Sequence, residues 1–367
     1  MNDINSKKTK LHNWHIHNNA KIVNFSGYAM PLYYSSIIDE HNAVREKVGL
    51  FDISHMGSVI VSGNGSKQFL QKVTTNDIES LSAGKAQYSA MCNENGNLID
   101  DFIVYDRECD YLLVFNSINT EKNIRWLFKH NIEDVKIKNQ TDKVSILSIQ
   151  GPSSIDVLRN NLSIDIDELS FYHFQDAQLN GINCMVSRTG YTGELGYEIF
   201  STIKNVIALW EEILNLGKDH GIKPVGLGCR DTLRMEMNYA LYGNEINENI
   251  NPFEAGLGWI TSMKKNKFIG RSSLLNLKKK IRKKLVCLVL DEKSIPRSGY
   301  QIKKDGKKVG KITSGTMSPS LKKGIGIGFI DINHAKIGNL VKVKVRGNEK
   351  NATIINPPFY KEGSLHH

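Results

Sequence analysis

NENGNLIDDFIVY, residues 93–105, is the part of this sequence with the clearest structural signal. Asn95 and Gly96 form a dipeptide typical of a tight hairpin turn, and the apolar run after them is typical of a β-strand. Residues 87–91, just before the turn, also have the pattern of a strand. The segment is therefore predicted to form the second arm of a β-hairpin.

Two carboxylates, Asp100 and Asp101, interrupt this apolar run. Successive side chains of a strand point to opposite faces, so the two aspartates are expected on different faces. Burying an unpaired carboxylate is costly, so at least one should meet water, an arginine, backbone N–H groups or a polar ligand. This stretch alone leaves two interpretations open: a solvated aspartate beside a structural ion pair, or a carboxylate in a ligand site.

The composition is that of an ordinary globular protein, with 40% hydrophobic and 23% charged residues among 367. This length suffices for two or three domains. No apolar run approaches the roughly 18 residues of a membrane span, and the first residues lack the apolar segment of a signal peptide. We therefore expect a cytoplasmic protein that does not bind a membrane. The five cysteines and eleven histidines show no metal-binding or disulfide spacing, so no metal site is predicted.

The net charge of +10 is compatible with a nucleic acid, an anionic substrate or an acidic protein as partner. The densest basic run, residues 278–284, contains no aromatic side chain that could stack on a base. It therefore favours a solvated helix end over a nucleic-acid site.

Helical and strand patterns alternate along the first 284 residues, with hairpins among them. Helices are predicted at 37–47, 66–73, 120–130, 153–159 and 205–218. Strands are predicted at 59–61, 87–91, 111–116, 145–150 and 184–188. This order indicates an α+β fold rather than a doubly wound parallel sheet.

The pattern changes at Leu285, where short strands follow one another without a helix. They are predicted at 285–290, 309–313, 325–330, 340–345 and 352–355. Five such strands indicate a small β-barrel or sandwich, with a domain boundary near Leu285.

Two further stretches carry polar residues in unusual settings. RTGYTGELGYE, residues 188–198, is a glycine-rich turn that presents Tyr191 and Glu194, and it suits either a plain hairpin loop or a binding site. It matches neither a dinucleotide-binding nor a P-loop motif. In residues 226–246, Arg230 and Arg234 share a helix face, where they suit a surface ion pair, a ligand carboxylate or an aspartate of residues 93–105.

Taken in order, these stretches resemble the T-protein family of the glycine cleavage system, the aminomethyltransferases. The matching segments are AKIVNFSGYAMPLYY from Ala20, IIDEH from Ile37, GLFDISHMG from Gly49, NGNLIDDFIVY from Asn95, SIQGP from Ser148, TGYTGELGYEI from Thr189, GLGCRDTLRMEMNYALYGNEI from Gly226, TSGTMSPSLKKGIGIGF from Thr313 and PPFY from Pro357. Together they span nearly the whole chain.

The resemblance implies two interlocked α+β lobes and a C-terminal β-barrel, arranged as three lobes around a central folate site. The expected folate-binding region covers residues 1–284, and the expected barrel covers 285–367. Within the first region, one lobe is expected to combine roughly 1–50 with 141–250, and the other 51–140 with 251–284.

The resemblance also implies an activity and its partners. Members transfer the one-carbon unit of an aminomethyl group, carried on the dihydrolipoyl arm of H-protein, to tetrahydrofolate. Ammonia and 5,10-methylenetetrahydrofolate are the products. The expected co-substrate is tetrahydrofolate, the expected partner is lipoylated H-protein, and neither a metal nor a nucleic acid is expected. Basic residues would then steer an acidic H-protein.

The family pattern assigns roles to particular residues. Asp101, the second of the paired aspartates, is the expected catalytic residue, acting to orient the pterin and stabilise developing positive charge. The residues expected to bind folate are Tyr88, Asn116, Tyr191, Glu194 and Arg230. Glu194 suits the donor edge of the pterin, and Arg230 suits a carboxylate.

Two departures from the family pattern and two alternatives remain. Gly96-Asn97 replaces a pair of glycines, and asparagine tolerates a positive φ. Lys361 stands where some members have an arginine, and it lacks the planar fork.

One alternative is an iron–sulfur maintenance protein on the same scaffold, whose loop carries a cysteine that residues 189–194 lack. The other is a nucleic-acid-binding protein, which rests on net charge alone.

Overall fold

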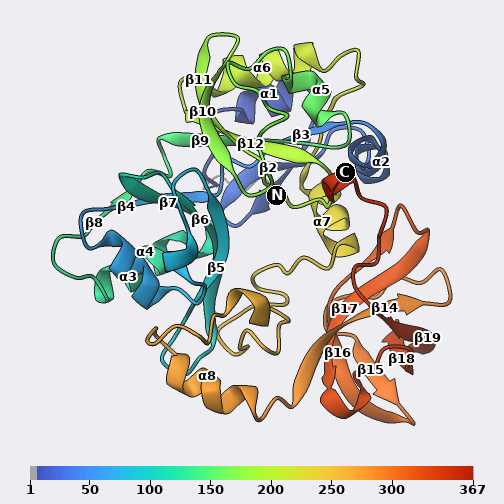
Figure 1. The fold of residues 1–367 in the computed structure, drawn as a ribbon. Coiled ribbons are helices and arrows are strands. Elements are labelled where there is room, and N and C mark those ends of the chain that lie inside the picture. Colours follow the sequence, from blue (N-terminus) through green and yellow to red (C-terminus); the bar gives the residue numbers. More distant parts are fainter. Residues whose placement is uncertain (1–5, 367) are drawn as a thin grey trace.

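The computed structural model describes residues 6–366 and contains two α+β lobes and a β-barrel (Figure 1). One lobe is built on a six-stranded sheet, the other on a five-stranded sheet, and the barrel is closed by six strands. The predicted α+β class and C-terminal barrel are confirmed.

The six-stranded sheet has the order β10-β11-β12-β9-β3-β13. Its strands are β3 (Gly49–Asp52), β9 (Val144–Gln150), β10 (Phe174–Leu179), β11 (Ile182–Ser187), β12 (Gly196–Thr202) and β13 (Lys223–Pro224). The helices drawn beside it in Figure 1 are α1 (His12–His17), α5 (Ser154–Leu158) and α6 (Val206–Leu216). Their apolar side chains share one core with the sheet, in which Trp210 is fully buried.

The five-stranded sheet, order β5-β6-β7-β4-β8, is inserted between β3 and β9 of the first sheet. Its elements are β4 (Gly57–Ser62), α3 (Ser66–Val73), β5 (Ala86–Cys92), β6 (Leu98–Asp106), β7 (Asp110–Phe115), α4 (Thr120–Lys129) and β8 (Lys136–Asn139). The chain returns to this lobe after residue 246, where Ile260 and Leu274 bury against Leu98. The two lobes are therefore interlocked in sequence.

The predicted hairpin joins β5 and β6 through residues 93–97, closed by hydrogen bonds between the backbones of Asn93 and Asn97 and of Gly96 and Asn93. Gly96 takes the left-handed conformation, with φ of 82°, whereas Asn97 is not among the residues with positive φ. Asn97 therefore does not need the tolerance of a positive φ that asparagine offers. Helix α8 (Arg271–Lys278) packs closely on this turn. A Cβ at position 96 would lie only 3.1 Å from the side chain of Leu274, so the contact favours glycine there.

Two helices lie between the six-stranded sheet and the barrel. These are α2 (Ile37–Glu46) and α7 (Leu227–Glu236), and the β1–β2 hairpin (Lys21–Phe25, Tyr28–Tyr33) packs beside them. The remaining short turns are the 3-10 helices η1 (Ile78–Ser80), η2 (Ser117–Asn119), η3 (Gly258–Ile260), η4 (Ile332–His334) and η5 (Ser364–His366).

The barrel has one strand more than the five predicted. Its strands are β14 (Lys283–Leu290), β15 (Gln301–Lys304), β16 (Lys307–Ser318), β17 (Lys323–Asp331), β18 (Leu340–Val345) and β19 (Asn348–Ile355). Strand β15 was not predicted because it is short and mostly polar: of its four residues only Ile302 is buried. It pairs with β16 and β18 and so closes the barrel.

The described part of the chain contains neither a candidate membrane-spanning helix nor a candidate metal site. No helix within residues 6–366 is long and apolar enough to cross a membrane. The same residues contain no group of three or more His, Cys, Asp or Glu side chains arranged to hold a metal ion.

Candidate functional site

Asp101 and Tyr88 form the centre of the candidate site. They lie on neighbouring strands, where Asp101 pairs with Ala90 and Tyr88 with Ile103, so their side chains are diagonal neighbours on one face. The hydroxyl of Tyr88 donates a hydrogen bond of 2.7 Å to Oδ2 of Asp101. Both side chains are partly exposed. The ring of Trp259, which is 71% exposed, lies 5.6 Å from that of Tyr88.

Asn116 holds the other oxygen of Asp101. The ladder between β6 and β7 begins at the pair Phe102–Phe115, so Asp101 extends beyond it and Asn116 follows its last residue. The amide of Asn116 donates to Oδ1 of Asp101 at 2.9 Å and to its carbonyl at 3.0 Å. Asp101 thus has both carboxylate oxygens oriented by neutral donors.

Tyr191 and Arg230 contact each other beside this pair. The guanidinium of Arg230 lies over the ring of Tyr191, with Cζ 4.7 Å from the centroid, and Tyr239 stacks on the same tyrosine at 5.5 Å. The hydroxyl of Tyr191 donates to the carbonyl of Ala240. Within residues 6–366, no hydrogen bond holds the guanidinium of Arg230.

Burial dominates the electrostatics of these residues. It raises the pKa of Asp101, and the hydrogen bonds from Tyr88 and Asn116 oppose that rise. It also raises the pKa of Tyr88, with the charge of Asp101 adding to the effect. Tyr88 is therefore a protonated donor at neutral pH. Burial likewise raises the pKa of Tyr191, on which the charges of Arg234, Asp101 and Arg230 also act.

Glu194 does not join this cluster. Its side chain is only 2% exposed, and Nη1 of Arg45 pairs with Oε1 at 2.7 Å. The backbone N–H and hydroxyl of Ser364, in the C-terminal tail, donate to Oε2 at 2.8 and 2.6 Å. Both oxygens are engaged by the chain itself. The prediction that Glu194 binds a pterin therefore requires these contacts to rearrange.

Ser364→Ala is expected to lower the free energy of unfolding by about 1–2 kcal/mol, because it removes a hydroxyl that serves a buried carboxylate. The same hydroxyl accepts from the backbone N–H of Leu195 at 3.0 Å. Urea unfolding of the two proteins measures the difference. Ser273→Ala is the control, since it removes an exposed hydroxyl bond to the carbonyl of Glu94. Equal, small losses in both variants would show that the tail does not anchor Glu194.

Sequence reasoning missed Glu198, which does lie near the cluster. It is 8% exposed on β12, and Thr189 donates to its Oε2 at 2.6 Å. Burial lowers the pKa of Arg230, and the charge of Glu198 acts against that effect. Burial raises the pKa of Tyr172, with Glu198 adding to the rise. Glu194 lies in the glycine-rich turn itself, whereas Glu198 lies on β12, which begins at Gly196. The sequence carries no local signal that singles out Glu198.

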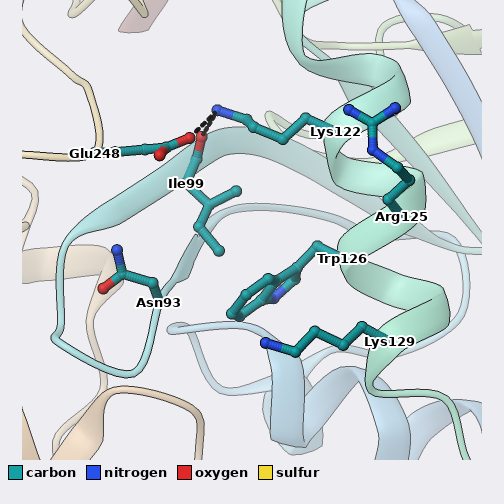
Figure 2. Close-up of a pocket in the computed structure, with 7 residues that line it drawn as sticks. All are labelled: Asn93, Ile99, Lys122, Arg125, Trp126, Lys129 and Glu248. Atoms are coloured by element: carbon teal, nitrogen blue, oxygen red, sulfur yellow. Dashed lines mark hydrogen bonds and ion pairs between the residues drawn. The ribbon is translucent and has the colours of Figure 1, made fainter.

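A separate groove of about 250 Å³ lies between α4 on one side and Asn93, Ile99 and Glu248 on the other (Figure 2). Figure 2 shows Lys122, Arg125 and Lys129 projecting from this helix. Lys122 donates to the carbonyl of Ile99 at 2.8 Å and pairs with Glu248 at 3.0 Å. Lys129 pairs with Glu94 at 3.2 Å. Two cations of the groove, Lys122 and Lys129, are therefore already paired with carboxylates of the chain. Lys122 also holds the strand next to Asp100 through the carbonyl of Ile99.

Comparisons with known proteins cover both regions of the chain. The family model described as the GCVT N-terminal domain matches residues 11–265, and the glycine cleavage T-protein C-terminal barrel domain matches 283–361. The chain is 45% identical over 362 residues to an aminomethyltransferase from Caldanaerobacter subterraneus subsp. tengcongensis, covering 98% of this chain and 97% of the relative.

Further relatives agree with this match. An aminomethyltransferase from Bacillus subtilis is 43% identical over 359 residues, with 97% of this chain and 99% of the relative covered. Among solved structures, the glycine cleavage system aminomethyltransferase T from Bartonella henselae superposes with a TM-score of 0.91. It is 30% identical, and the match covers 98% of this chain and 99% of that one.

Proposed function

The chain belongs to the glycine cleavage T-protein family and is an aminomethyltransferase that uses tetrahydrofolate, and we propose that its aminomethyl donor is lipoylated H-protein and that Asp101 is its catalytic residue. The observation that carries the assignment is the partly exposed Asp101 carboxylate, with one oxygen bound by Tyr88 and the other by Asn116. Tetrahydrofolate supplies the nitrogen that accepts the one-carbon unit.

The residues around Asp101 suit a pterin. A pterin presents several N–H donors, and each oxygen of Asp101 has a lone pair left after its bond to Tyr88 or Asn116. Because both bonds fix the carboxylate before a ligand arrives, it can accept those N–H groups without reorganising. Its negative charge then stabilises positive charge that develops at the transferred carbon. Asp101 acts as an orienting electrostatic group rather than as a strong base.

Arg230 and Tyr191 supply the complementary part of the site. The guanidinium carries donors that residues 6–366 leave without a hydrogen bond, so it can bind acceptor atoms of the folate. Stacking on Tyr191 holds its plane in place. Glu198 lies near enough to act on the charge of Arg230, and it is the better placed of the two glutamates to meet the bound folate.

A direct assay tests the proposed function. The purified protein is incubated with tetrahydrofolate and aminomethyl-loaded H-protein, and ammonia and 5,10-methylenetetrahydrofolate are measured. Stoichiometric formation of both products is expected only when H-protein is present. Product formation at the same rate from free aminomethyl-dihydrolipoamide would contradict the assignment of H-protein as the donor.

Arg230→Lys is expected to raise the KM for tetrahydrofolate about tenfold, with a smaller change in kcat. Lysine keeps the charge but loses the planar group that stacks on Tyr191 and presents several fixed donors. Steady-state kinetics with varied tetrahydrofolate measure the effect. Arg125→Lys, an exposed change on α4, serves as the control and should leave KM unchanged. An unchanged KM for Arg230→Lys would remove Arg230 from the folate site.

A further inference from the structure

Asp100, the neighbour of the proposed catalytic residue, is fully buried and surrounded by asparagine amides. Its Oδ1 accepts from Asn116 at 2.8 Å and from Asn119 at 2.7 Å, and its Oδ2 accepts from Asn123 at 2.5 Å. We call these three asparagines the amide cage. No salt bridge involves Asp100 within residues 6–366, so neutral donors alone offset the cost of burying it.

The amide cage uses side chains that would ordinarily serve their own helices. Asn116 is the N-cap residue of η2 and Asn119 that of α4, yet neither side chain makes a capping hydrogen bond. Both donate to Asp100 instead. Asn123 follows within α4, whose N-terminal end favours a negative charge. On the same helix, Lys122 binds the carbonyl of Ile99 (Figure 2).

Asn116 connects the amide cage to the site. One nitrogen, Nδ2, lies 2.8 Å from Oδ1 of Asp100 and 2.9 Å from Oδ1 of Asp101. It also lies 3.0 Å from the carbonyl of Asp101. An amide nitrogen has two hydrogens, so its orientation toward these acceptors depends on where Asp100 is held. Asn119 and Asn123 hold Asp100 without touching Asp101.

From this geometry we propose that Asp100, held by Asn119 and Asn123, is a positioning residue for Asp101: it fixes the amide of Asn116, which in turn fixes the carboxylate that meets the folate. This inference rests on the proposed role of Asp101. Burial, with the charge of Asp101 adding to it, raises the pKa of Asp100 to about 7. A carboxylate in such a position is costly, so stability alone does not explain it.

Asn119→Ala tests the proposal, because Asn119 touches Asp100 but not Asp101. We expect kcat to fall about tenfold, as small misplacements of catalytic groups do, while the KM for tetrahydrofolate changes less than twofold. In a background of Asp101→Asn, measured in single-turnover mode, the same change should cause no further loss. Loss of the same factor in both backgrounds, or an unchanged kcat, would overturn the proposal.

Two further variants keep the test decisive. Asp100→Asn should retain kcat within about threefold, because its oxygen still accepts from Asn116 and Asn119, and a rotated Asn123 can offer its own oxygen, which is buried without a partner within residues 6–366. A loss as large as that of Asn119→Ala would count against positioning. Should Asn119→Ala not fold, Asn119→Ser carries the same expectation, since the shorter hydroxyl does not reach Asp100.

A matched control separates these outcomes from failure of the proposed function. Asn161→Ala also removes an amide hydrogen bond, the partly buried one from Asn161 to the carbonyl of Val157, but in the six-stranded lobe. It should leave kcat unchanged. If the wild-type protein formed no methylenetetrahydrofolate, the proposed donor or reaction would be wrong. If the wild type were active and Asn119→Ala had the same kcat, the positioning role alone would be wrong.

Discussion

Asp101→Asn is expected to lower kcat about 10²- to 10³-fold, the usual loss when one preorganised electrostatic group is removed from an active site. Asparagine keeps the size of the side chain but removes its negative charge. With its NH₂ turned to the hydroxyl oxygen of Tyr88, which can accept, and its oxygen turned to the amide of Asn116, it keeps both neighbours, so the loss reports the missing charge. The measurement is the rate of methylenetetrahydrofolate formation with saturating substrates.

The same substitution should not destabilise the fold. Burial raises the pKa of Asp101, so the ionised side chain is less favourable in the folded state than in the unfolded chain. A raised folded pKa contributes stability that is full below the unfolded pKa and is lost as the pH rises through the folded pKa. At pH 7 the neutral asparagine should therefore leave Tm unchanged or higher. A fall of several degrees would mean that the activity loss reports unfolding instead.

Asp176→Asn is the control for Asp101→Asn. Asp176 is also a strand aspartate, but it is exposed on β10 in the other lobe. Its replacement should change neither kcat nor Tm. Turnover like that of the wild type in Asp101→Asn would reject the catalytic role, whatever the control showed.

Local structure was predictable because it depends on neighbours in sequence. Helix α3 begins at Ser66 and ends at Val73 as predicted, and the Asn95-Gly96 turn lies between β5 and β6. Strand β10 was missed, because its acidic and amide residues mask the alternation that buries Ala177 and Leu179.

The candidate site was predictable only in part, because many of its contacts join residues that are far apart in sequence. That Tyr88 meets Asp101 depends on the register of the hairpin, and the family resemblance pointed to both residues. The amide cage had a signal in the sequence, since Asn116, Asn119 and Asn123 follow helical spacing onto one face. What that face meets depends on packing of α4 against β6. The partners of Glu194, Arg45 and Ser364, are separated from it by 149 and 170 residues, and no local pattern reveals them.

Glu236→Gln is expected to lower the free energy of unfolding at pH 7 by about 3 kcal/mol, because Glu236 is the buried acceptor where α2, α7 and the barrel meet. It pairs with Nη2 of Arg45 at 2.8 Å and with Nε2 of His41 at 3.3 Å. From the barrel, Ser318 and Ser320 donate to it. Glutamine keeps the size but leaves Arg45 with one carboxylate fewer.

The pH dependence of this loss identifies its cause. Burial alone would raise the pKa of Glu236, but hydrogen bonds from His41 and Ser318 and the charges of His41 and Arg45 lower it from 4.5 to about 2. A lowered folded pKa contributes stability above the unfolded pKa, and this contribution is lost as the pH falls through the folded value. The difference between wild type and Glu236→Gln should therefore be full above pH 5 and shrink between pH 4.5 and about 2.

Urea unfolding at pH 7 and at pH 3 measures the prediction, with Glu79→Gln as the control. Glu79 is exposed, and its ion pair with Lys67 is long, at 3.8 Å, so its replacement should cost less than about 0.5 kcal/mol at either pH. A difference for Glu236→Gln that stayed constant from pH 7 to pH 3 would mean that shape, not charge, joins the barrel to α7. Because Arg45 also holds Glu194, loss of this joint should loosen the C-terminal tail as well, making it more sensitive to carboxypeptidase than in the wild type.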